Sequence, residues 1–161
     1  MTVENALIAT IYQGWHTYQE TLIKAITPLN AEQLSLRASS DLRSVREIAA
    51  HMIGARARWL DWTEGGDAFK PFCRWDRPEA KVWSAEEIVA GLQATWSAMQ
   101  EAISRWTPRD WEQTWPGDVA DGDPEVITRP FVIWHLIEHD LYHGGQISTT
   151  LGAHSLPTLE L

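Results

Sequence analysis

The sequence has 161 residues, of which 22% are charged and 44% hydrophobic, and a formal net charge of −9. This length and composition predict one domain over residues 1–161 with an ordinary hydrophobic core. The acidic charge argues against a nucleic-acid partner, and the lack of a long apolar run argues against a membrane partner. Because the chain has one cysteine and an acidic start, we expect no disulfide, no signal peptide and a cytoplasmic location.

Four amphipathic helices follow one another along the chain, and no alternating strand pattern competes with them. Ser44 with Glu47 and Ser84 with Glu87 are capping boxes, and Thr128 is a good N-cap for the last helix. A proline or a glycine pair ends each of the first three helices. The predicted helices cover residues 3–26, 44–64, 84–106 and 129–151. Long connections join them, so the sequence predicts an all-α four-helix bundle.

The bundle-facing stripe of the last helix changes from apolar to polar halfway along. Val132 and Leu136 suit a core, but the next positions are His139, His143 and Gln146. Buried polar side chains need partners. His139 and His143 are four residues apart, which puts their rings one turn apart on one face and suits two ligands of one metal ion. The alternative is a pair of hydrogen-bonded core or surface histidines.

A catalytic metal site usually needs a third protein ligand and keeps one position open. His135 lies one turn before His139, but ligands at i, i+4 and i+8 would span about 12 Å of helix axis. We therefore interpret His135 as a residue that flanks the pocket. His51, in the middle of the second helix, is the strongest remaining candidate. The predicted metal ligands are His51, His139 and His143.

Several neighbouring side chains could orient these histidines or line a pocket. Gln146 lies on the histidine stripe, and Glu47 lies one turn before the histidine of the second helix but also has a capping role. Tyr142 could orient a substrate or simply pack. Glu138 and Asp140 could be acid–base groups or plain surface charges. The catalytic residue itself stays unassigned.

Two segments resemble the signature of the DinB/YfiT-like superfamily of four-helix metalloproteins, SVREIAAH (44–51) and HLIEHDLYHGGQ (135–146). The resemblance follows the helix order over the whole chain. It implies that the three histidines bind zinc, nickel, iron or manganese, with water completing the shell. Some relatives are S-transferases or isomerases that use bacillithiol, mycothiol or glutathione, so the resemblance also makes a low-molecular-weight thiol a candidate cofactor. Many relatives carry arginine where this chain has Gly144, which weakens the carry-over of any particular activity.

These observations favour a divalent-metal-dependent enzyme acting on a small molecule. An open three-histidine site can activate water, polarise a carbonyl or hold a thiolate, so a thiol-dependent S-transferase or isomerase and a hydrolase are both expected reactions. The alternative is a non-catalytic metal-binding protein with a stress-response or interaction role, which the absence of a clear acid–base residue favours.

The last helix is apolar on a second face, at Ile133, Ile137, Leu141 and Ile147. Packing inside the bundle could account for this face, and so could a homodimer interface. Since relatives in the resembling superfamily often form dimers, we expect a homodimer.

Overall fold

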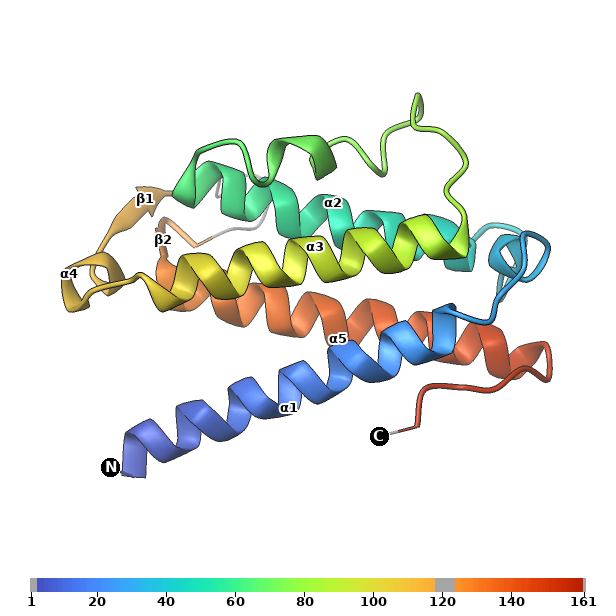
Figure 1. Cartoon of the computed structure of the whole chain (residues 1–161), viewed down its shortest axis with the longest axis horizontal. Coiled ribbons are helices and arrows are strands. Elements are labelled where there is room, and N and C mark those ends of the chain that lie inside the picture. The colour runs from blue at the N-terminus through green and yellow to red at the C-terminus, as the bar shows by residue number, and fades with distance from the viewer. Residues whose placement is uncertain (1–2, 118–123, 161) are drawn as a thin grey trace. The chain divides into compact units, whose positions relative to one another are not determined.

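The computed structural model describes residues 3–117 and 124–160, and four long helices account for most of them. They are α1 (Val3–Ile26), α2 (Val45–Glu64), α3 (Ala85–Ser104) and α5 (Arg129–Ala153) (Figure 1). Their bounds lie within two residues of the predicted ones, and the all-α class is confirmed. The short helical elements are η1 (Gln33–Ser35), η2 (Lys70–Phe72) and α4 (Pro108–Trp111).

The helix starts use the predicted caps. The backbone N–H of Ser44 donates to Glu47 at 2.6 Å, and the Glu47 N–H donates to the Ser44 hydroxyl at 3.3 Å. Ser84 and Glu87 make the same reciprocal pair at 3.0 and 3.2 Å. The Thr128 hydroxyl accepts a hydrogen bond from the backbone N–H three residues later, at 3.2 Å. These bonds satisfy N–H groups that the first helical turn cannot pair internally, which fixes where each helix begins.

Two short strands precede α5, within the long connection that was predicted before the last helix. β1 (Thr114–Pro116) and β2 (Val126–Thr128) pair antiparallel, with Trp115 opposite Ile127. Three-residue strands are too short to show an alternating pattern in the sequence. Their effect is local, because they bury Ile127 and lead the chain into α5.

The described residues fall into two compact units. The first comprises Met1–Ala50, Val82–Ala90 and Leu141–Leu161. Within it, the Tyr18 hydroxyl of α1 donates to the backbone carbonyl of Leu141 at 3.2 Å. Its fully buried apolar side chains come from all four long helices: Leu22, Ile26, Val45, Ile88, Ile147 and Leu151.

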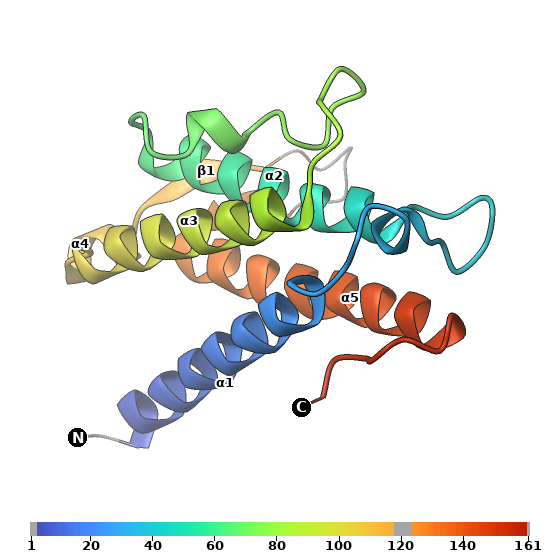
Figure 2. The same ribbon diagram turned by 45° about the vertical axis from the view of Figure 1, so that its right-hand side comes forward.

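The second unit comprises His51–Lys81 and Gly91–Asp140. It holds most of α2 and α3 and the first half of α5, and its fully buried apolar side chains include Ile53, Leu60, Leu92, Met99, Ile127 and Leu136. The connection that contains η2 runs beside α2 in both views (Figures 1 and 2). The single domain over residues 1–161 stays a prediction.

The tryptophans contribute less to the core than their number indicates. Of the ten, only Trp15 and Trp96 are buried, and Trp62, Trp111 and Trp134 are exposed. Core packing therefore does not account for most of them. Several lie instead on the second unit's surface and on the walls of a cavity described below.

The second apolar face of α5 is only partly exposed. Ile137 and Ile147 are buried within the chain, whereas Leu141 is 46% exposed. Packing inside the chain therefore accounts for part of this face, and the homodimer stays a prediction. In the described part of the chain, no helix combines the length and apolar character needed to cross a bilayer.

Candidate metal centre

The His51 ring is hydrogen-bonded to the carboxylate of Asp76, which lies in the connection after η2. Its Nδ1 lies 2.8 Å from Asp76 Oδ2, and the Arg58 guanidinium grips the same carboxylate with two hydrogen bonds of 2.7 and 2.9 Å. Because a carboxylate accepts hydrogen bonds, Nδ1 carries the proton and Nε2 keeps its lone pair. The pair therefore fixes both the ring orientation and the tautomer that a metal ligand needs.

Asp76 is ionised under ordinary conditions. Burial raises its pKa, but the hydrogen bonds and charges of Arg58 and His51 outweigh that effect and lower the pKa to about 2. Gly54, one turn beyond His51 on α2, makes this arrangement possible, because a Cβ there would lie 2.8 Å from both Arg58 Nη1 and Asp76 Oδ1. The missing side chain lets the ion pair lie against the helix.

His143 has an equivalent support on its own helix. Its Nδ1 lies 2.7 Å from Gln146 Oε1, three residues later on α5. An amide oxygen accepts a hydrogen bond, so Nδ1 again carries the proton and Nε2 is the available ligand atom. His143 is buried, and Gln146 is half-buried. The predicted supporting role of Gln146 thus corresponds to a direct contact with one of the three histidines.

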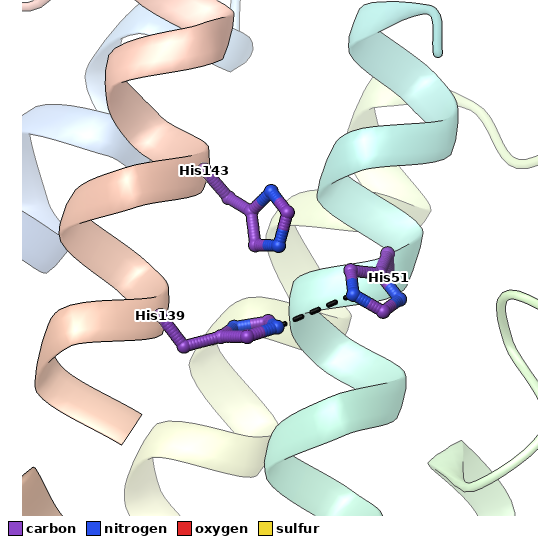
Figure 3. Close-up of side chains that lie close together, drawn as sticks. All are labelled: His51, His139 and His143. Atoms are coloured by element: carbon purple, nitrogen blue, oxygen red, sulfur yellow. Dashed lines mark hydrogen bonds between the residues drawn. The ribbon is translucent and has the colours of Figure 1, made fainter. Parts of the chain in front are cut away.

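The three predicted ligands form a cluster. Their ligand atoms all lie within 4.8 Å of one another, and His51 Nε2 and His139 Nε2 are 3.2 Å apart. Figure 3 shows the three rings turned toward one another, one from α2 and two from α5. Two nitrogens bound to one tetrahedral zinc ion at about 2.05 Å would be about 3.4 Å apart, close to the observed pair. The donor set therefore suits a first-row divalent ion.

A cavity of about 490 Å³ opens beside two of these histidines, within the second unit. His51 and His139 line it together with the aromatic rings of Trp59, Trp62 and His135, and Ala55, Arg58 and Pro116 complete the lining. This volume is typical of small-molecule sites. His135 therefore lines the cavity and is not among the three histidines of the cluster.

A second cavity, of about 560 Å³, lies within the first unit. Its walls include His143, Gln146 and Tyr142. Tyr142 is exposed and its ring contacts His143 edge to face, with 5.0 Å between centroids. It lines a cavity as the prediction allowed.

The comparison with known proteins agrees with this fold. The model of the DinB family matches residues 1–154 of the sequence. The chain belongs to the DinB family. A crystal structure of a DinB-like protein from Bacillus cereus ATCC 10987 superimposes with a TM-score of 0.72 at 22% identity, over 96% of this chain and 97% of that one. At this identity the likeness shows the fold alone. No curated protein matches the sequence.

The remaining carboxylates near the DinB signature are engaged elsewhere. Glu47 accepts hydrogen bonds from Ser44 and pairs with Arg37 at 2.8 Å, so the structure shows its capping role. Asp140 is fully buried and pairs with Arg56 at 2.6 Å. Glu138 lies 3.1 Å from His135. The expectation that Asp140 could be a plain surface charge was wrong.

The structure leaves no room for a side chain at Gly144. A Cβ at this position would lie 2.0 Å from the Tyr18 hydroxyl oxygen and 2.8 Å from its ring carbon Cζ. Tyr18 is buried and hydrogen-bonded to Leu141, so it has little room to move. The Tyr18 ring of α1 thus occupies the space that any side chain at position 144 would need.

Asp76 and Arg58 are the site residues that sequence reasoning missed. Asp76 lies in an irregular connection that shows no periodicity, and its approach to His51 is a tertiary contact. The sequence feature that could have indicated this contact is Gly54, in the interior of α2. A glycine in a helix interior costs about 1 kcal/mol relative to alanine and indicates a close approach by another group.

Proposed function

We propose that this DinB family protein is a divalent-metal-dependent enzyme with an open three-histidine site. The observation that carries the proposal is the convergence of His51, His139 and His143, with ligand atoms within 4.8 Å of one another. Two of the three rings are oriented by partners on Nδ1, which are Asp76 and Gln146. A histidine pair that was only structural would not need a third imidazole or these two supports.

The expected substrate is a small molecule. A bound divalent ion would make a coordinated water or thiol more acidic and would polarise a carbonyl. The chain's own residues supply orientation, because Asp76 and Gln146 hold two imidazoles with Nε2 available. Aromatic side chains of the adjoining cavity offer an apolar surface to a small molecule. These features support a thiol-dependent S-transferase or isomerase, or a hydrolase. The protein is proposed to act as a homodimer.

One observation favours the alternative of a non-catalytic metal-binding protein in stress response or interaction. Three of the carboxylates that could transfer protons are held in ion pairs with arginine, Glu47 by Arg37, Asp76 by Arg58 and Asp140 by Arg56. The fourth, Glu138, lies beside His135. A metal-bound water could itself serve as the acid or base, so this observation does not exclude turnover.

The test is turnover by metal-loaded protein. Zinc, nickel, iron and manganese forms are each incubated with glutathione, bacillithiol or mycothiol and an electrophile, and separately with esters and amides. The proposal expects turnover that disappears in metal-free protein and in His139→Ala. Stoichiometric metal without turnover in any combination would support the non-catalytic alternative instead.

A further inference from the structure

The cavity beside His51 and His139 runs along one face of α2. Beyond His51, its lining residues from α2 are Ala55, Arg58, Trp59 and Trp62, which follow His51 by four, seven, eight and eleven positions. At the rise of an α-helix, this stripe extends about 16 Å from the histidine end. His135, one turn before His139, continues the wall along α5. The cavity is therefore elongated, with coordinating groups at one end only.

Away from His51 and His139, the wall of the cavity is aromatic. The Trp59 ring lies edge to face with Trp62, with 5.6 Å between centroids, and is tilted against His135 at 4.9 Å. Trp62 is 45% exposed although it is one of the largest apolar side chains in the chain. Such a set of rings offers both faces and edges, which favours a further aromatic ring over an aliphatic group of equal size.

The charges along this wall are already balanced. Both terminal nitrogens of Arg58 donate to Asp76, and Nη1 also donates to the backbone carbonyl of Cys73 at 3.0 Å. His135 Nδ1 lies 3.1 Å from Glu138. Because the guanidinium charge is already paired with a carboxylate, it attracts an anionic tail less than an unpaired arginine would. The part of a ligand that lies here is therefore uncharged.

We propose that the substrate is an elongated molecule with a metal-coordinating head at the histidine end and an uncharged aromatic tail against Trp59 and Trp62. This inference rests on the proposed metal-dependent function and adds the substrate class. It assigns Ala55 a specificity role as well, since a small side chain at this position keeps the middle of the cavity open.

Hydroxamates test the head and the tail separately, because the hydroxamate group chelates divalent metal ions. Binding to zinc-loaded protein is measured by calorimetry for acetohydroxamate, 4-phenylbutanohydroxamate and 4-cyclohexylbutanohydroxamate. We expect the phenyl compound to bind at least about tenfold more tightly than acetohydroxamate, and about threefold more tightly than the cyclohexyl compound.

Variants locate the tail. In Trp62→Ala, we expect the phenyl compound to bind only about threefold more tightly than acetohydroxamate, or less, instead of tenfold. The affinity for acetohydroxamate itself should stay unchanged. Ala55→Leu, which narrows the cavity and keeps every ring, should have the same effect and serves if Trp62→Ala does not fold. Trp134→Ala is the matched control, because Trp134 is 57% exposed and does not line the cavity.

The outcomes separate this inference from the function on which it rests. Equal affinities for the short and the phenyl compound in wild type would overturn the substrate class while leaving the metal site intact. The substrate class would also be overturned if the phenyl compound still bound about tenfold more tightly than acetohydroxamate in both Trp62→Ala and Ala55→Leu. Failure of zinc-loaded protein to bind even acetohydroxamate would overturn the open metal site and the inference with it.

Discussion

At the scale of single residues, the most informative side chain is Asp76. Its carboxylate contacts Nδ1 of the His51 ring, and Arg58 donates two further hydrogen bonds that fix the position of the carboxylate. A carboxylate behind a ligating histidine raises the basicity of the ligand and restricts its rotation. Asp76 is thus a positioning residue whose effect should appear in metal affinity.

Replacing Asp76 is predicted to weaken metal binding without removing a ligand. We expect Asp76→Ala to bind zinc about 10- to 100-fold more weakly, and Asp76→Asn to lose less because its amide oxygen still accepts a hydrogen bond. Competition with a chromophoric chelator measures the change. Asp67→Ala is the control, since Asp67 lies in the same connection but pairs with Lys70 at the surface. Wild-type affinity in Asp76→Ala would show that the contact has no role in binding.

Gly144 and Gly145 form a natural pair for testing close packing. A Cβ at Gly144 meets Tyr18 at 2.0 Å, whereas at Gly145 it meets no atom within 4 Å. We expect Gly144→Ala to lower the free energy of unfolding by about 1–3 kcal/mol. Gly145→Ala should leave it unchanged or raise it by up to about 1 kcal/mol, because alanine favours the helix. Urea denaturation measures both, and equal stabilities would contradict the steric account.

At the scale of elements, the start of α2 depends on the cap made by Glu47. Burial raises the pKa of this carboxyl, but hydrogen bonds from Ser44 and Arg37 outweigh it and hold the pKa below the ordinary 4.5. A pKa that is lower in the folded than in the unfolded state means that the charged form stabilises the fold. That contribution is present above the ordinary value and is lost as the pH falls below it.

We therefore predict a shallower acid dependence for Glu47→Gln. Between about pH 5 and about pH 3, the free energy of unfolding should fall less in this variant than in wild type. Denaturant titrations at a series of pH values provide the measurement. Glu86→Gln, at an exposed position in the first turn of α3, is the control and should follow wild type. Parallel curves for wild type and Glu47→Gln would refute the capping contribution.

Within the second unit, a buried ion pair fastens α2 to α5. The side chains of Arg56 and Asp140 are 1% and 0% exposed, and they are joined by hydrogen bonds of 2.6 and 3.1 Å. Arg56 also lies over the ring of Trp96. Removing one partner of such a pair leaves a buried charge, which is much more costly than replacing both.

We expect Asp140→Leu alone to lower the free energy of unfolding by about 3–5 kcal/mol. The double variant Arg56→Met with Asp140→Leu should recover most of this loss, because it leaves no unpaired charge. Arg105→Met, which breaks an exposed pair with Glu101, should cost less than about 1 kcal/mol. The thermodynamic cycle would contradict the account if the double variant were as unstable as the single one.

At the scale of the whole molecule, local signals predicted the helices well and tertiary contacts poorly. The starts of α2 and α3 followed from capping boxes, and the change from Leu136 to His139 on one stripe predicted that α5 carries part of a site. Burial of His143 and its contact with Gln146 agree with that stripe. Each of these signals lies within a few residues of the feature it predicts.

The features that were missed depend on residues far apart in the sequence. Asp76 reaches His51 across 25 positions, and Arg56 reaches Asp140 across 84. The first half of α1 illustrates a related limit of local patterns, since Ile8 and Ile11 lie on an amphipathic helix but are exposed. Periodicity identifies a face that can be buried, but it does not show how far along the helix a partner covers it.

The most direct test of the metal centre is the metal content of protein purified without an affinity tag or chelator. We predict about one equivalent of a first-row divalent ion in wild type and little or none in His51→Ala, His139→Ala and His143→Ala. His135→Ala and His154→Ala should keep the metal, because neither residue belongs to the cluster. Wild-type protein that contains no metal and takes up none on reconstitution, or metal retained in all three cluster variants, would contradict the account.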